Sequence, residues 1–363
     1  MPFMRVLVVD DSTLFRKIVR DAIADEPGVE VVGTAVNGKM ALEKVEQLKP
    51  DVVTLDLEMP EIDGLEVLRR LQRMPSPPRV LMLSSFTVEG ASLTTQALRL
   101  GAFDFIRKPD AASLEANCMQ LRAEIGPKLR LVAAALQRAT DAGQRKSSVS
   151  CPLPANTGPA GRVATAPAPQ IIAIGVSTGG PAALALLLPK LPADLPTPIV
   201  IVQHMPPIFT KSMADDLDRM CKLRVREAAG GERLSAGDVY IAPGGRQMKV
   251  VRGGYGPELC VTDEPPEKNC RPSVDYLFRS LAHMYGDKVL AIILTGMGDD
   301  GLLGCKLLKR NGATIIAQNE ASCVVYGMPR QVVDLGLADA VLPLDGMHSL
   351  IVDRACREAL QCP

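Results

Sequence analysis

The chain of 363 residues contains no tryptophan, and aromatic residues make up only 3% of it. Proteins that bind single-stranded nucleic acid stack bases on aromatic side chains, so this scarcity argues against that class. An excess of one charge is also missing, because 41 lysines and arginines balance 41 aspartates and glutamates. Without a basic surplus, nothing indicates binding to a polyanion. We therefore expect no nucleic-acid partner.

Long hydrophobic runs and metal-binding cysteine patterns are missing too. No apolar stretch reaches the roughly 20 residues of a membrane-spanning helix. The nine cysteines form no Cys-x-x-Cys pair and no Cys/His spacing suited to zinc, so we expect reduced thiols that serve as small apolar residues. The first residues lead directly into a strand pattern instead of a signal peptide. Together these absences predict a cytoplasmic protein.

What is present divides into two α/β domains. In the first, short apolar runs alternate with amphipathic ones, and the predicted strands are 5–9, 29–35, 51–55, 80–84 and 103–106. Five strands separated by helices predict a parallel sheet with helices on both faces. A helical stretch then gives way to a segment rich in Ser, Thr, Pro and Ala, typical of a linker. We predict domains at residues 1–125 and 170–358, joined by a helical extension and linker at 126–169.

Acidic and phosphate-binding side chains follow the strands of the first domain. Asp10 and Asp11 come after the first strand, and Asp56 ends the third. Because the carboxyl ends of parallel strands share one edge, these carboxylates should meet there. Clustered carboxylates favour a hard cation such as Mg²⁺. Ser84 and Lys108 end the next two strands and add a hydroxyl and an ammonium suited to a phosphoryl group.

This half of the chain, about residues 4–125, closely resembles the response-regulator receiver domain. The resemblance is carried by Val8-Val-Asp-Asp-Ser12, Asp56-Leu-Glu-Met-Pro60 with Asp63-Gly64, Leu81-Met-Leu-Ser-Ser85 and Arg107-Lys-Pro109. It implies a flavodoxin-like five-stranded parallel sheet whose phosphoacceptor is Asp56. It further implies Mg²⁺ ligands and residues that sense the phosphoryl group: Asp10, Asp11, Asp56 and the carbonyl of Glu58 for the metal, and Ser84, Lys108 and Phe105 for sensing.

In the second domain, three apolar strands end on reactive side chains. Residues 171–174 lead into Gly175-Val-Ser-Thr-Gly179, residues 199–202 lead to His204, and residues 291–294 lead to a glycine-rich turn with Asp299 and Asp300. At one sheet edge, a serine, an imidazole and a carboxylate form an activated nucleophile. Spacing alone does not choose between the two aspartates.

Each of these signals has a plainer interpretation. The G-x-S-x-G pattern around Ser177 also occurs in phosphate-binding and structural turns, although the Lys-Ser/Thr of a P-loop is missing here. Of the three histidines, His283 lies in a helical run and His348 near the end of the chain, so only His204 follows a buried strand. The order Ser, His, Asp differs from the Ser, Asp, His order of α/β-hydrolases, which argues against that fold.

Over about residues 170–358, this half resembles the catalytic domain of chemotaxis protein-glutamate methylesterases, the CheB family. The motifs are Ile174-Gly-Val-Ser-Thr-Gly-Gly180, Gln203-His-Met-Pro-Pro207, Tyr240-Ile-Ala-Pro-Gly-Gly245, Arg271-Pro-Ser-Val-Asp275, Leu294-Thr-Gly-Met-Gly-Asp-Asp-Gly301 and Gly327-Met-Pro-Arg330. The resemblance implies a doubly wound α/β methylesterase domain and roles for five residues: nucleophile Ser177, base His204, orienting carboxylate Asp300, and oxyanion donors in the backbone N–H groups of Thr178 and Met297. Two positions depart from the family pattern: Val176 replaces the usual alanine, and Cys270 stands where a ring side chain is common.

The combined resemblance implies phosphorylation-regulated hydrolysis of glutamate γ-methyl esters, and deamidation of glutamines, on chemoreceptors. The implied partners are methyl-accepting chemoreceptors as substrate and a histidine kinase as phosphodonor, which places the protein at the periphery of membrane-bound receptor arrays. Mg²⁺ is expected for receiver phosphorylation only, and no cofactor for hydrolysis. The receiver is expected to act as a displaceable lid. Two alternatives stay open: a response regulator with a non-catalytic output domain, and a serine hydrolase of small esters or peptides.

Overall fold

The computed structural model describes residues 3–111, 113–145 and 166–356. The chain forms two compact units, Met1–Pro152 and Leu153–Pro363, each described here by itself. Helix α5 (Leu114–Arg145) continues well past residue 125. Within the predicted helical extension and linker at 126–169, residues 146–165 lie outside the described residues. Within the described ranges, no helix is long and apolar enough to cross a membrane.

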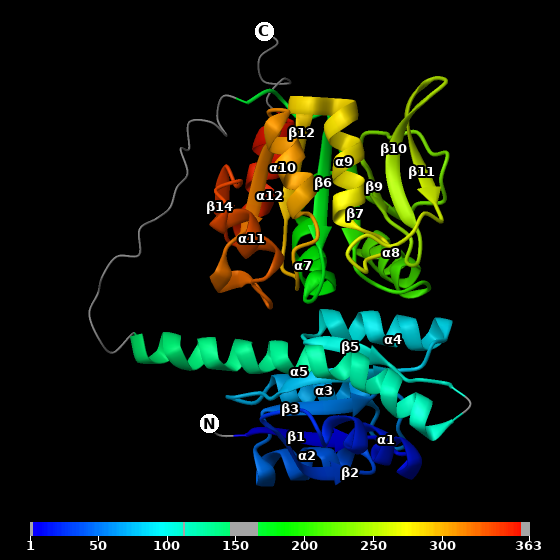
Figure 1. The fold of residues 1–363 in the computed structure, drawn as a ribbon, viewed down its shortest axis with the longest axis vertical. Helices are drawn as coiled ribbons and strands as arrows, with labels where there is room; N and C mark the ends of the chain where they lie inside the picture. Colours follow the sequence, from blue (N-terminus) through cyan, green and yellow to red (C-terminus); the bar gives the residue numbers. More distant parts are fainter. Residues whose placement is uncertain (1–2, 112, 146–165, 357–363) are drawn as a thin grey trace. The chain divides into compact units, whose positions relative to one another are not determined.

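The N-terminal unit is one parallel sheet with strand order β2-β1-β3-β4-β5 (Figure 1). Its strands are β1 (Met4–Val9), β2 (Val29–Ala35), β3 (Val52–Asp56), β4 (Arg79–Ser84) and β5 (Asp104–Arg107). Its helices, besides α5, are α1 (Thr13–Ile23), α2 (Gly38–Leu48), α3 (Gly64–Gln72) and α4 (Val88–Arg99). The order confirms the predicted flavodoxin-like receiver fold.

Local sequence explains where these helices begin. Each of α1 to α4 is preceded by a residue whose side-chain oxygen accepts the N–H three residues further on, namely Ser12, Asn37, Asp63 and Thr87. Such caps satisfy N–H groups that have no partner inside the helix, at about 1 kcal/mol each. The caps therefore set where each helix begins after its strand, directly beyond the strand end for α1, α2 and α4 and after a longer loop, from Asp56 to Gly64, for α3.

The C-terminal unit contains a seven-stranded sheet with order β14-β13-β12-β6-β7-β9-β8 in which all pairs are parallel. Its strands are β6 (Ile171–Val176), β7 (Ile199–Gln203), β8 (Arg224–Glu227), β9 (Asp238–Ile241), β12 (Val289–Ile293), β13 (Thr314–Gln318) and β14 (Ala340–Leu342). Two further strands, β10 (Gln247–Gly253) and β11 (Gly256–Thr262), pair as a separate antiparallel hairpin. The parallel sheet confirms the predicted α/β class, whereas the hairpin was not predicted.

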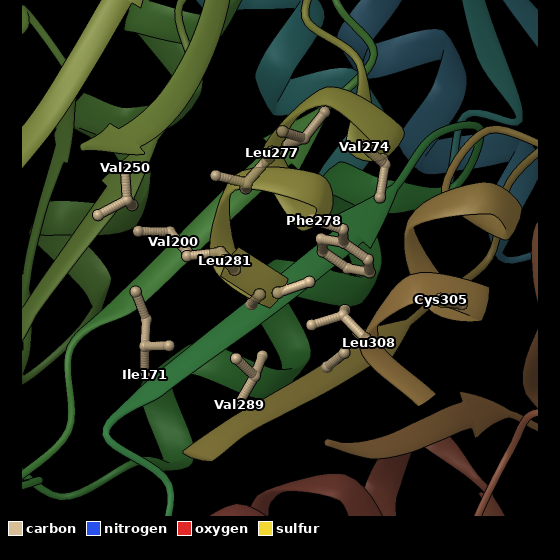
Figure 2. Packing of buried hydrophobic residues seen from close by; sticks show 14 of the residues in the cluster. Ile171, Val200, Val250, Val274, Leu277, Phe278, Leu281, Val289, Cys305 and Leu308 are labelled. Carbon is tan, nitrogen blue, oxygen red and sulfur yellow. The ribbon is translucent and has the colours of Figure 1, made fainter. Parts of the chain in front are cut away.

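Helices alternate with these strands along the chain. They are α7 (Gly180–Leu187), α8 (Phe209–Met220), α9 (Val274–Tyr285), α10 (Leu302–Arg310), α11 (Met328–Asp334) and α12 (Leu344–Ala355), with one-turn helices η1 (Leu188–Lys190), η2 (Gly286–Lys288) and η3 (Glu320–Ser322). Figure 2 shows the face of α9 that carries Leu277, Phe278 and Leu281 packed over the strands, beside Val200 and Val289. All five are fully buried, and each such side chain contributes about 1.5–3 kcal/mol. This packing fixes the start of α9 above the sheet edge.

Candidate active site and phosphorylation site

Strands β7 and β12 flank β6 on either side, so the carboxyl ends of all three strands meet at the point where the strand order reverses. In open α/β sheets, ligands bind at this point. Val176 pairs with Gln203 in the register of β6 and β7, and the next residues along the two strands are Ser177 and His204. The His204 N–H donates to the Val176 carbonyl at 3.2 Å. The predicted nucleophile and base therefore leave the sheet side by side.

The structure brings His204 together with Asp300, the residue predicted as its orienting carboxylate. Nε2 of His204 lies 2.7 Å from Oδ2 of Asp300. Asp300 is only 3% exposed, and four further donors surround it: the N–H groups of Val274, Asp275 and Gly301 and the hydroxyl of Ser273. Three of these donors belong to the N-terminus of α9, where a helix favours negative charge. Asp300 is thus held as a buried, fully hydrogen-bonded carboxylate.

These contacts shift both pKa values. Burial alone lowers the pKa of His204, but hydrogen bonds with Asp300 and Cys270 outweigh burial and raise it to about 9. Burial alone raises the pKa of Asp300, but His204 and the α9 N–H groups lower it overall. The pair therefore favours imidazolium beside carboxylate, the charge state that a general base reaches after accepting a proton.

Because Asp300 occupies Nε2, Nδ1 is the ring nitrogen of His204 that does not contact the carboxylate. The two nitrogens could not be distinguished from the sequence. Near Nδ1 lies the thiol of Cys270, at 4.0 Å. The cysteine that departs from the family pattern therefore lies at the side of the imidazole opposite the contact with Asp300.

Ser177 is fixed by the turn that follows β12. Its N–H donates to the Thr295 carbonyl at 3.0 Å, and its carbonyl accepts from Nε2 of Gln203 at 3.0 Å. Gly296 passes so close that a Cβ there would lie 2.8 Å from Cβ and 3.0 Å from N of Ser177. A glycine at position 296 is therefore required, because any larger residue there would displace Ser177.

The predicted oxyanion donors lie on the same two turns. The Thr178 carbonyl accepts from the hydroxyl of Thr295 at 2.9 Å, which ties the turn after β6 to that after β12. Met297 is 45% exposed, and among the described residues none accepts its N–H. A free N–H beside the serine turn is what a developing oxyanion needs.

Asp299 and Asp300 are separated by their surroundings. Asp299 is exposed, and its carboxylate binds Nζ of Lys268 at 2.9 Å. The same Nζ lies 3.1 Å from the buried Asp275. Asp299 therefore links the turn after β12 to the loop that contains Lys268, whereas Asp300 is the aspartate that contacts His204.

Several positioning residues went unpredicted. Ser273 caps α9 and donates to Asp300 at 2.9 Å, while Gln247 accepts the Ser273 N–H at 2.9 Å and donates to the Cys270 carbonyl at 3.3 Å. A serine before an apolar helical run is a capping signal that could have identified Ser273. Gln247, on the first strand of the hairpin, carries no such signal.

The receiver-like unit gathers its predicted polar residues at the carboxyl edge of its sheet. Nζ of Lys108 lies 2.8 Å from Asp10 and 2.7 Å from Asp56, and both carboxylates are buried. Asp11 is exposed, and the three carboxylates offer oxygens within 4.8 Å of one another. Burial and the neighbouring Asp10 raise the pKa of Asp56 to about 6, although Lys108 and the Glu58 N–H act in the opposite direction.

The other predicted receiver residues are nearby or in the core. Ser84 is fully buried, and its Oγ accepts from the hydroxyl of Thr94 in α4 at 2.6 Å. Phe105 is buried in β5 with Nζ of Lys128 5.7 Å from its ring centre. The Asp63-Gly64 motif needs glycine at its second position, because a Cβ on Gly64 would lie 2.1 Å from the carbonyl oxygen of Asp56.

The receiver carboxylates fit a divalent cation. Their hard oxygen ligands match the preference of Mg²⁺, and exposure of Asp11 leaves an open side for water and phosphoryl oxygens. Bound there, Mg²⁺ would be held by Asp10, Asp11 and Asp56 with the Glu58 carbonyl. Its charge would offset the negative charge of the three carboxylates.

Comparison with known proteins agrees with both halves. The family model for the CheB methylesterase matches residues 172–351, and that for the response regulator receiver domain matches residues 6–118. The catalytic domain of a Thermotoga maritima CheB methylesterase, a solved structure, is 42% identical, with a TM-score of 0.50 over 51% of this chain and 98% of that one.

Full-length relatives share the whole arrangement. A protein-glutamate methylesterase/protein-glutamine glutaminase of Desulfotalea psychrophila is 45% identical over 97% of this chain and 98% of its own. One of Trichodesmium erythraeum is 42% identical over 98% and 99%. With both domains matched in this order and the similarity extending over nearly the full length, the chain belongs to the CheB family of receiver-linked protein-glutamate methylesterases/protein-glutamine glutaminases.

Proposed function

We propose that the protein hydrolyses γ-methyl esters of glutamate on methyl-accepting chemoreceptors, and deamidates specific glutamines there, with Ser177 as the nucleophile. The observation that carries this proposal is the 2.7 Å contact between His204 and Asp300 at the strand edge from which Ser177 emerges. A degenerate binding module has no need to preserve a buried imidazole–carboxylate pair beside a serine turn.

In the first half of the reaction, Oγ of Ser177 attacks the ester carbonyl while Nδ1 of His204 takes the hydroxyl proton. Asp300 stabilises the resulting imidazolium through Nε2. The backbone N–H groups of Thr178 and Met297 receive the oxyanion, and one such donor typically contributes about 3–4 kcal/mol. As the C–O bond to methanol breaks, His204 returns its proton to the leaving oxygen.

In the second half, water attacks the acyl-serine while Nδ1 of His204 takes one of its protons. The bond between the acyl carbon and Oγ of Ser177 then breaks, His204 returns the proton to Oγ, and the glutamic acid formed loses its proton to solvent. A glutamine side chain follows the same route, with ammonia in place of methanol. No step requires a cofactor.

Substrate choice tests this proposal against a general serine hydrolase. Methanol release from methylated receptor membranes and cleavage of a small aryl ester would be compared for the wild type and Ser177→Ala. We expect both activities to be lost in the variant and the receptor ester to be strongly preferred in kcat/KM. Cleavage of the aryl ester alone would favour the small-ester alternative, and neither activity would favour a non-catalytic output domain.

We further propose that phosphorylation of Asp56 by a histidine kinase, with Mg²⁺, controls this activity. Lys108 contacts Asp56 already, and Ser84 ends the neighbouring strand β4, where its buried hydroxyl is bonded to Thr94. A phosphoryl group on Asp56 adds about two negative charges and so changes the electrostatic balance between Lys108 and the carboxylates around it. Ser84 and Phe105 then shift, as in other switches built on a local charge change.

The receiver is proposed to act as a lid over the Ser177 edge that phosphorylation displaces. This proposal is supported by the presence of a receiver and an esterase in one chain. We also propose that the protein acts in the cytoplasm, at the periphery of receptor arrays. Removing residues 1–150 should raise the basal rate of methanol release. An unchanged or lower rate, in a fragment that melts cooperatively, would contradict the lid.

A further inference from the structure

Cys270 takes part in no step of the proposed reaction, although its sulfur lies 4.0 Å from Nδ1 of His204. That nitrogen is the one that must accept the Ser177 proton. We propose that His204 and Cys270 form an inhibitory binding site for Zn²⁺, or a similar thiophilic divalent cation, which switches the esterase off by occupying Nδ1. The inhibition part of this proposal rests on the proposed function, whereas the binding part does not.

The ligand types and their spacing support such a site. Imidazole nitrogen and thiolate sulfur are preferred zinc ligands, at about 2.0 and 2.3 Å, so a tetrahedral ion places them about 3.5 Å apart. The observed separation of 4.0 Å needs only a small movement of the side chains. Within the described ranges, His204, Cys270 and Asp300 are one of two groups of three such residues whose ligand atoms lie within 4.8 Å.

Asp300 has a different part in this site. Its two oxygens already accept five hydrogen bonds, so it is poorly placed to be a direct ligand. Its bond to Nε2 of His204 instead holds the ring so that Nδ1 faces the metal. Zinc-binding histidines commonly have a carboxylate on their other nitrogen in this way. Water would complete the four ligands of the ion.

The backbone that carries Cys270 is pre-organised. Residues 267–270 form a tight turn closed by two bonds, Glu267 N–H to Cys270 carbonyl at 3.1 Å and Cys270 N–H to Glu267 carbonyl at 2.7 Å. Lys268 and Asn269 both have positive φ, 48° and 62°, as such a turn requires. Nζ of Lys268 is held by Asp299 and Asp275, so its charge is balanced. Cys270 is partly exposed, which leaves a path for the ion.

Binding is a ligand exchange that balances without a redox partner. The thiol of Cys270 and the imidazolium of His204 each release one proton to buffer as the S–Zn and N–Zn bonds form. The ion then blocks proton transfer from Ser177. A chelator that removes Zn²⁺ restores the free imidazole and, with it, activity.

The test uses the full chain with excess Mg²⁺, which occupies the receiver carboxylates. Co²⁺, a spectroscopic substitute for Zn²⁺, should give a thiolate-to-metal absorption band that Zn²⁺ displaces. Cys270→Ser should lose this band, while the matched control Cys260→Ser, on β11 of the hairpin, should keep it. In ester hydrolysis, relative to each variant's own metal-free rate, Cys270→Ser should raise the half-inhibiting Zn²⁺ concentration at least about tenfold.

The outcomes separate the two proposals. A Co²⁺–thiolate band that survives in Cys270→Ser, or zinc inhibition equal in wild type and Cys270→Ser, would overturn the metal site. A band specific to Cys270 in a chain that hydrolyses no ester would support the metal site and contradict the esterase. No band in the wild type would overturn the metal site whatever the esterase does.

Discussion

Replacing Asp300 by asparagine is the most informative single perturbation of the site. The change removes a charge and converts one oxygen into an NH₂ group among five donors. If the amide nitrogen faces His204, it donates to Nε2 and pushes the ring proton onto Nδ1. In that tautomer Nδ1 is a donor and no longer accepts the proton of Ser177.

The structure also sets a magnitude. The pKa of His204 is raised from its ordinary 6.5 to about 9, and the hydrogen bond with Asp300 is the largest of the effects that raise it. One pKa unit corresponds to about 1.4 kcal/mol, so the net preferential stabilisation of the imidazolium is about 3–4 kcal/mol. Losing it slows the chemical step by about 10²–10³-fold. The unfavourable tautomer adds to this, so we expect at least a hundredfold loss in kcat.

The assay is kcat for methanol release, with thermal melting to verify that each variant folds. Asp299→Asn is the matched control, because Asp299 is the adjacent carboxylate, is 53% exposed and contacts Lys268 in place of the histidine. We expect Asp299→Asn to retain activity within a few-fold. A folded Asp300→Asn within tenfold of wild type, or equal losses in both variants, would refute the assignment of Asp300 as the orienting carboxylate.

Three further predictions follow from particular contacts. Since a general base must be neutral, the raised pKa of His204 predicts that kcat/KM increases with pH up to about 9, measured above a Ser177→Ala blank; a plateau already reached at pH 7 would contradict it. Gly296→Ala places a Cβ against Ser177 and should reduce kcat about a hundredfold in a folded protein, whereas wild-type kcat would show that the serine need not be held there. Gly64→Ala pushes on the Asp56 carbonyl and should abolish labelling by a small phosphodonor, followed by phosphoprotein gel analysis; normal labelling would contradict it.

The sequence was informative where a strand is buried on both faces and ends on a polar residue. The apolar runs before Ser177, His204 and Asp56 could be recognised because a central parallel strand is buried on both faces and is therefore mostly apolar. Because parallel strands have their carboxyl ends at the same edge of the sheet, the pattern also predicted which side chains share that edge.

Features that depend on tertiary contact could not be predicted in this way. The hairpin of β10 and β11 carries Gln247, which supports Ser273 from a distance of 26 residues. The choice of Nε2 for Asp300 and the approach of Cys270 to Nδ1 arise from how the turns fold over the sheet edge. Strand and helix periodicity report which face a residue occupies, but not which atom it meets.

The central claim is that Ser177 performs ester hydrolysis under the control of Asp56. It is tested most directly by the rate of methanol release from methylated receptor membranes, with and without a small phosphodonor and Mg²⁺, for the wild type, Ser177→Ala and Asp56→Asn. We expect stimulation of the wild type by the phosphodonor, no release by Ser177→Ala, and unstimulated release by Asp56→Asn. Release by a folded Ser177→Ala, or equal stimulation of Asp56→Asn and wild type, would contradict it.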